Sequence, residues 1–151
     1  MNYENLRISK LRAYMLTMID ELLNSTDYQI NVDMLDNEPE NFSLDKIPTA
    51  STVEKWIDGT ETHRDVYNFR SRKAYSQDTI NNLKNIGFFE QLEDKINSNN
   101  KKGILPDIEG IENIKCLNSG TMNRADTQTA EFDIQIQVIY KKYYDVNILS
   151  L

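Results

Sequence analysis

The sequence predicts the α+β fold class: a mostly antiparallel, mixed β-sheet packed against an N-terminal helix and a central broken helix. In residues 129–144, apolar and polar side chains alternate with the period of two that is typical of a strand. In residues 5–24 and 76–97, apolar residues recur every three or four positions, as on one face of a helix. Together these observations place one long, half-buried strand at the centre and the other elements around it.

The first helix is expected over residues 5–24. Its apolar side chains step by four, three and four residues, and charged side chains keep to the other positions. The stripe consists of Leu11, Met15, Met18 and Leu22. The polar run at residues 24–27 ends the helix. A methionine-rich stripe can form an adaptable binding groove, but at this spacing it is more typical of an ordinary core.

Two short strands follow, at residues 29–35 and 42–47, and Pro48 ends the second. Residues 33–45 form an acidic stretch with no basic residue before Lys46. Its carboxylates are Asp33, Asp36, Glu38, Glu40 and Asp45. Such spacing can suit a divalent cation, but the glycine and the terminal glutamate of a calcium loop are missing. We therefore expect a solvated acidic loop.

Residues 53–75 predict a β-hairpin, because Asp58-Gly59 is a strong two-residue turn signal. In the second arm, apolar side chains take one face, and Arg70 and Arg72 project together from the other. The two arginines indicate either an inter-subunit ion pair or a contact to phosphate or carboxylate. The alternative is a solvated sheet face.

The second helix is expected over residues 76–97, with Ser76 as its N-cap and a break or bend near Gly87. Its first apolar stripe consists of Ile80, Leu83 and Ile86. The polar tract at residues 97–103 predicts a flexible turn after the helix.

The last part of the chain predicts a strand at residues 111–117, a polar loop at 118–127 whose tip projects, and the long strand as its antiparallel partner. Residues 145–151 follow as a docking tail. Its apolar side chains are Val146, Ile148, Leu149 and Leu151. They are costly to leave in water, so the tail either returns to the core of its own subunit or docks on a neighbouring copy.

The bulk composition bounds the function. The 151 residues suit one domain, 1–151. A formal charge of −7 and a pI near 4.7 argue against a general nucleic-acid binder and against an anionic membrane surface. No apolar run suits a transmembrane helix, and the polar start predicts no secretory signal. One cysteine excludes an internal disulfide, which suits a reducing cytoplasm.

The usual motifs of catalysis are missing from the sequence, which has no phosphate-binding loop, dinucleotide fingerprint or serine elbow. One histidine, His63, and one cysteine, Cys116, are too few for a zinc site, and we expect no metal, cofactor or enzyme activity. A His63–Cys116 catalytic pair stays open, although a lone cysteine in an apolar strand is usually a small buried hydrophobe. Carboxylates are numerous, but nothing in their spacing selects a catalytic pair.

Several segments follow one another in a recognisable order along nearly the whole chain. After the first helix come INVDMLDNEPENFSLDKIP, the WIDGT hairpin, NFRSRKAYS, GFFEQLEDKI, KKGILP and IKCLNSGTMNRADTQTAEFDIQIQVIYKKYY. This pattern resembles the phage tail terminator, or minor capsid (head–tail joining), proteins of low-GC Gram-positive phages and prophages. The fold expected is therefore tail-terminator-like. The tail DVNILSL is longer and more apolar than the family leads us to expect.

The resemblance implies a structural virion protein of the tail or neck, assembled in the host bacterial cytoplasm. Such proteins form a homo-hexameric ring on the head-proximal end of the tail tube, end tube polymerisation and present a surface to the neck. The partners implied are further copies of the chain, the tail tube protein, the tail sheath and neck or connector proteins. DNA only passes through the lumen, where acidic charge would repel its phosphates.

A ring of six copies needs a heterologous interface that closes. We expect its contacts in the acidic stretch 33–45 and in two further sets. They are the sheet and loop residues Arg70, Arg72, Asn118, Gly120, Thr121, Asn123 and Arg124, and the tail residues Ile148, Leu149 and Leu151. The alternatives are a neck protein that joins head to tail and, from another class, a small cytoplasmic ligand-binding module or a carboxylate-using enzyme. A deep pocket that holds two close carboxylates with raised pKa would favour a module or enzyme of this other class.

Overall fold

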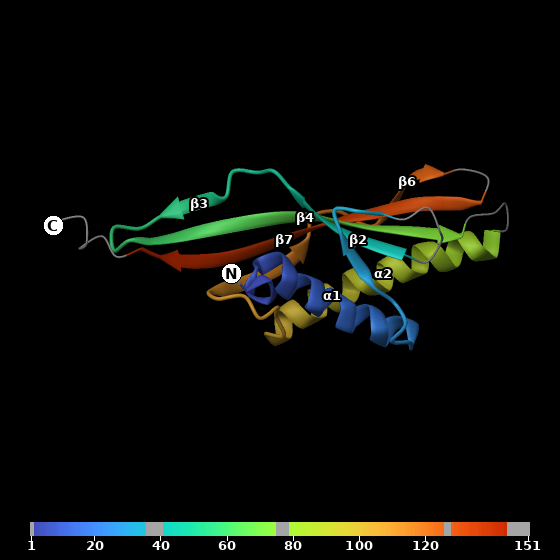
Figure 1. Ribbon diagram of the computed structural model, residues 1–151, viewed down its shortest axis with the longest axis horizontal. Coiled ribbons are helices and arrows are strands. Elements are labelled where there is room, and N and C mark those ends of the chain that lie inside the picture. The colour runs from blue at the N-terminus through green and yellow to red at the C-terminus, as the bar shows by residue number, and fades with distance from the viewer. Residues whose placement is uncertain (1, 36–40, 75–78, 126–127, 145–151) are drawn as a thin grey trace.

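In the residues that it describes, the computed structural model confirms the α+β class, with one mixed sheet of seven strands and two α-helices (Figure 1). It describes residues 2–35, 41–74, 79–125 and 128–144. The predicted N-cap Ser76 and the tail 145–151 lie outside this part of the chain.

Two long antiparallel strands form the centre of the sheet, β4 (Thr60–Ala74) and β7 (Thr129–Tyr143). They pair along their whole length, from Thr60 opposite Tyr143 to Ala74 opposite Thr129. Each carries two short strands along its outer edge: β2 (Asn41–Ile47) and β3 (Thr52–Lys55) on β4, and β5 (Ile111–Cys116) and β6 (Thr121–Ala125) on β7. Strand β1 (Ile30–Val32) pairs with β2 in parallel and makes the sheet mixed.

Both helices, α1 (Arg7–Leu23) and α2 (Thr79–Lys102), lie on one side of the sheet in Figure 1. A short 3₁₀ helix, Tyr3–Asn5, precedes α1. The predicted face of β7 is buried at every position: Phe132, Ile134, Ile136, Val138 and Tyr140 are each at most 4% exposed. This confirms the long half-buried strand, because only a period of two brings these five side chains to one face.

The predicted break in the second helix is wrong. α2 runs without interruption through Gly87. A glycine lowers helix propensity without removing a backbone donor, and the buried Phe88 and Phe89 that follow fix the helix on the sheet. The expected first stripe is not buried at Leu83 and Ile86, which are exposed.

The predicted end of that helix is also wrong, because α2 continues to Lys102. Tertiary contacts hold the asparagine-rich last turns: Asn99 is buried, and the side chain of Asn100 accepts a hydrogen bond from Ile114 N at 2.9 Å. Gly103, with φ of +74°, follows the helix in the left-handed conformation typical of a C-terminal cap.

The segment 118–127, predicted as a loop, contains strand β6. β6 pairs with residues 130–133 of β7 and carries a register shift between Met122 and Arg124. Asn118 fixes the segment before β6 to β7, since its Oδ1 accepts a hydrogen bond from Gln135 N at 2.7 Å. A polar composition concealed the strand, because β6 lies at an edge where few apolar side chains are required.

Candidate interaction surfaces

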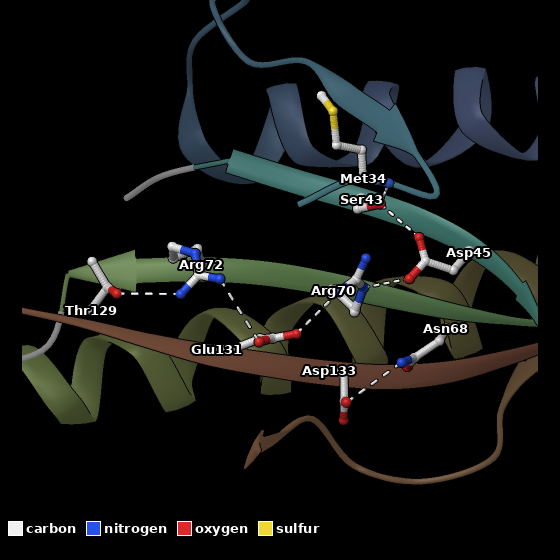
Figure 2. Close-up of polar contacts among 9 residues, drawn as sticks. All are labelled: Met34, Ser43, Asp45, Asn68, Arg70, Arg72, Thr129, Glu131 and Asp133. Atoms are coloured by element: carbon white, nitrogen blue, oxygen red, sulfur yellow. Dashed lines mark hydrogen bonds and ion pairs between the residues drawn. The ribbon is translucent and has the colours of Figure 1, made fainter. Parts of the chain in front are cut away.

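The sheet face opposite the helices carries a network of charged side chains (Figure 2). It forms because the register of β4 and β7 places Arg70 opposite Asp133 and Arg72 opposite Glu131. Strand alternation turns these four side chains away from the apolar core. We call this surface the open face.

Glu131 is the centre of the network. Its Oε1 lies 3.3 Å from Arg70 Nη1, and its Oε2 lies 3.9 Å from Arg72 Nη2. Arg70 also forms an ion pair with Asp45 of β2. Burial disfavours charge on Arg70, but hydrogen bonds and attraction from Asp45 and Glu131 outweigh it and raise the pKa of this guanidinium. The two arginines thus already pair within the chain, so a contact to another subunit would add to an existing network.

Polar contacts extend the network towards β1 and β2. Ser43 Oγ donates a hydrogen bond to Asp45 Oδ1 at 2.7 Å and accepts one from Met34 N at 3.0 Å. Asn68 donates to Asp133 at 3.5 Å. Such bonds hold the charges in fixed positions, which favours recognition of a complementary charged surface over a flexible contact.

A second surface is the arm, which comprises β3, residues 60–64 and residues 139–143. In Figure 1 the outer ends of these strands extend beyond the helices. A tight turn closes the arm: Trp56 N donates to Thr60 O at 2.8 Å, and Gly59 N donates to Trp56 O at 3.2 Å. Ile57, inside this turn, is fully exposed, and Trp56 is 48% exposed. A turn was predicted here with Asp58-Gly59 at its centre, but the Gly59–Trp56 hydrogen bond centres it on Ile57 and Asp58. Its exposed apolar side chains were not predicted.

A groove of about 560 Å³ lies at the base of the arm. The start of α1, the end of β7 and residues 107–109 line it. Its cations are Arg7, Lys10, Lys141 and Lys142, and its acids are Asp107 and Glu109. The lining thus holds more cations than acids, although three of the cations already pair with carboxylates: Arg7 with Asp65, Lys10 with Asp107 and Lys141 with Glu112.

Beside the groove, a buried carboxylate binds the N-terminal helix to the sheet. Asp65 Oδ2 accepts hydrogen bonds from Arg7 Nε at 2.7 Å and from the Tyr67 hydroxyl at 3.0 Å. Its Oδ1 accepts one from the Tyr140 hydroxyl at 3.2 Å, and Lys46 Nζ lies 3.8 Å away. The Asp65 side chain is 2% exposed.

These contacts shift pKa values in opposite directions. Burial alone would raise the pKa of Asp65, but the hydrogen bond and charge of Arg7, with Lys46 and Tyr67, hold it below its ordinary value. Burial, followed by the charge of Asp65, raises the pKa of Tyr140 to about 12 and that of Tyr67 further. The phenols therefore remain donors to a charged carboxylate across the physiological range.

The histidine and the cysteine do not form a catalytic pair. His63 pairs with Tyr140 and Cys116 with Ile136, four residues apart along β7, which is roughly 13 Å of strand. His63 Nε2 instead lies 3.0 Å from Glu61 Oε1. Among the described residues, no three His, Cys, Asp or Glu side chains gather to hold a metal ion.

Cys116 is expected to react slowly in the native protein. Burial and the nearby charge of Glu93 raise its pKa from an ordinary 9.0 to about 12. That shift leaves roughly a thousandfold less thiolate at neutral pH, and thiolate is the reactive form. Iodoacetamide labelling followed by mass spectrometry should be far faster in urea than in buffer. Equal rates would show that the thiol is accessible and has an ordinary pKa.

The predicted contact residues of the 118–127 segment fall into two groups. Asn118 and Thr121 are exposed, and β6 also contains Asn123 and Arg124. Gly120 has a packing role, since a Cβ at this position would overlap the ring of Phe89 in α2. The tail residues Ile148, Leu149 and Leu151 lie outside the described residues.

The acidic stretch 33–45 is divided by the fold. Asp33 is exposed with a positive φ of 54°, and Asp45 is engaged by Arg70 and Ser43 on the open face. Asp36, Glu38 and Glu40 lie outside the described part of the chain.

No protein-family model matches the chain, and no curated protein sequence matches it. Neither α1 nor α2 has the length and apolar content that a membrane-spanning helix requires.

Proposed function

We propose that this chain is a structural virion protein that forms a ring of six copies on the head-proximal end of a phage tail tube. The ring ends tube polymerisation and provides the attachment surface for the neck. One observation carries the proposal furthest: the arm extends past the helical layer and ends in the exposed side chains of Trp56 and Ile57. Apolar side chains on a projecting ribbon are typical of a protein–protein contact.

The open face supports the same proposal. A ring needs a heterologous interface, in which one surface of each copy meets a different surface of the next. The arm tip is apolar, and the open face is charged and held in place by Glu131 and Arg70. Two such unlike surfaces on one subunit suit contacts to two different neighbours, another copy and the tube.

A second candidate function is a ligand-binding module. The groove at the base of the arm favours it, because its lining holds four cations and two acids, a balance that suits an anionic ligand. Titration with inorganic phosphate or a dicarboxylate, followed by calorimetry, tests this candidate directly.

Tube polymerisation tests the lead proposal. Tube protein from the same genome is polymerised with and without this chain, and tube lengths are measured by electron microscopy. We expect shorter tubes with a ring at one end. Ile57→Asp should lose this effect, because it places a charge on the apolar tip. Leu83→Asp, at an exposed position of α2, is the matched control. Tubes that elongate unchanged with the wild-type chain would overturn the proposal.

A further inference from the structure

The tip of the arm and the groove at its base lie on opposite faces of the same ribbon. Trp56 N donates to Thr60 O, and Thr60 pairs with Tyr143, so Trp56 continues the parity of the open face. Lys142 has the parity of the buried Tyr140 and lines the groove on the side of the helices. Because full-length strand pairing and the tight turn hold both positions, the tip cannot enter the groove of its own copy.

The groove is lined by tyrosines and by a lysine outside the ion pairs described above. Tyr143 and Tyr144 are 65% and 45% exposed, and Lys142 beside them is half-buried. Of the residues that the structure describes, none forms an ion pair with Lys142 or with Glu109, an exposed acid of the lining. The volume of about 560 Å³ lies within the range of about 300–1,000 Å³ that is typical of binding pockets. The groove therefore suits an apolar segment that carries charges of both signs.

The tip of the arm is such a segment. Ile57 is fully exposed and Trp56 is 48% exposed, although central turn positions usually hold polar residues or glycine. Asp58 follows Ile57, and a hydrogen bond from Thr60 N at 2.9 Å helps to hold the pKa of its carboxyl below the ordinary 3.8. Lys55, which is exposed, precedes Trp56. The tip thus offers an acid to Lys142 and a cation to the acid of the groove, which is electrostatic complementarity between two copies.

We propose that the arm tip of one copy binds in the groove at the base of the arm of the next copy. Trp56 and Ile57 pack on the tyrosines of the groove. Asp58 forms an ion pair with Lys142. This inference rests on the proposed function, because it names the contact that joins neighbouring copies of the ring.

The opposite orientation of tip and groove gives this contact a direction. When the tip of one copy occupies the groove of a second, the tip of the second copy points away from the groove of the first. Two copies therefore cannot exchange both contacts, and the unused tip and groove remain for further copies. Such a contact is heterologous, and a heterologous contact produces a closed ring or a filament rather than a two-fold dimer.

Trp56 reports the contact, because the sequence contains no other tryptophan. The tip buries on the order of a few hundred Å², less than the roughly 1,200–2,000 Å² of a stable complex, so the free chain should associate weakly and reversibly. Sedimentation velocity at increasing protein concentration should show species larger than a dimer. The emission of Trp56 should shift to shorter wavelength over the same concentration range.

Variants of the tip and of the groove should each remain monomeric with unshifted emission. Ile57→Asp places a charge on the apolar tip, and Lys142→Glu reverses the charge of the groove. Lys84→Glu is the matched control, because it makes the same charge reversal at an exposed lysine of α2 and should associate like the wild type. Circular dichroism checks that each variant is folded.

A mixture of the two variants tests the direction of the contact. Ile57→Asp keeps an intact groove and Lys142→Glu keeps an intact tip, so the mixture retains one contact and should stop at a pair with one copy of each. Asp58→Lys and Lys142→Glu, combined in one chain, exchange the two charges. The combined variant should recover the association that each change alone removes, because the two sites are coupled.

The proposal is overturned if the wild type stays monomeric with unchanged emission up to millimolar concentration, or if its association stops at a dimer. A mixture that forms no pair, or a charge-exchanged chain that stays monomeric, would also overturn it. Tubes that elongate unchanged beside a chain that passes these tests would count against the proposed function alone. Tubes that are capped by a chain that fails them would count against this contact alone.

Discussion

Replacing Asp65 with asparagine is expected to lower the free energy of unfolding by about 3 kcal/mol. The side chain is 2% exposed and accepts hydrogen bonds from Arg7, Tyr67 and Tyr140. An amide removes the negative charge and turns one of its two acceptor atoms into a donor, so the guanidinium loses its counter-ion. The value is below the upper range for buried pairs because Arg7 is one-third exposed and can recover water.

Urea unfolding followed by circular dichroism measures this difference. Asp107→Asn is the matched control, because Asp107 also pairs with a cation of α1, Lys10, but its side chain is 94% exposed. Exposed pairs contribute about 0–1 kcal/mol, so the control should be nearly neutral. If both variants lose the same stability, the cluster around Asp65 is not what binds α1 to the sheet.

The advantage of the wild type over Asp65→Asn should also depend on pH. The pKa of Asp65 is lower in the folded protein than its ordinary value of 3.8. A lowered carboxyl pKa gives stability that is fully present above the unfolded-state value and is lost as pH falls through the folded-state value. The difference between the two proteins should therefore be constant above pH of about 5 and shrink below about 4. A difference that persists unchanged in acid would mean that the charge does not contribute.

The long strands and their faces could be predicted from sequence because a period of two has only one structural explanation. Phe132 and Tyr140 belong to a single alternating run that no helix would place on one face. The hairpin could also be predicted, because its turn signal, Asp58-Gly59, lies in two neighbouring residues. The strand is confirmed in β7 and the hairpin in β3–β4, but the turn is centred on Ile57 and Asp58, with Gly59 following at a positive φ.

The errors lie where tertiary contacts override local preference. Gly87 lowers helix propensity, yet α2 continues because its next turn packs Phe88 and Phe89 on the sheet. The polar segment around Asn118 becomes part of the sheet because the long neighbour β7 offers an unpaired edge. Neither contact leaves a periodic signal in the segment itself.

The candidate surfaces were partly predictable. The shared orientation of Arg70 and Arg72 followed from strand alternation, but their partner Glu131 depends on the register between distant strands. Asp65 carried a usable signal, because it has the parity of the buried Tyr67 and is therefore a charged residue on an apolar face. The sequence carried no signal for the exposure of Ile57, because this exposure depends on how far the helices extend along the sheet.

The two long strands have a part that packs on the helices and a part that extends as the arm. Their middle parts pack on the helices, while residues 60–64 and 139–143 continue into the arm. The Asp65 cluster, held by Arg7, lies beside the groove at the base of the arm. A carboxylate that fixes α1 to β4 there limits movement of the arm relative to α1, and the proposed ring would require this.

Gly110→Ala is expected to destabilise the protein by about 3–4 kcal/mol, from backbone strain and overlap together. Gly110 has φ of +75°, and a Cβ there would overlap the carbonyl oxygen of Lys141 in β7. Its own carbonyl accepts a hydrogen bond from Lys141 N at 2.9 Å, so the two backbones cannot separate without losing this bond.

Two other glycines separate the causes of that loss. Gly103 has nearly the same φ, +74°, but nothing lies within 4 Å of a Cβ, so Gly103→Ala should cost only the strain, about 1 kcal/mol. Gly87 is helical with the same open space, and Gly87→Ala should stabilise by about 0.5–1 kcal/mol. Urea unfolding of the three variants should rank them in this order. If Gly110→Ala costs no more than Gly103→Ala, the close approach of Gly110 to Lys141 is not rigid and does not limit movement of the arm.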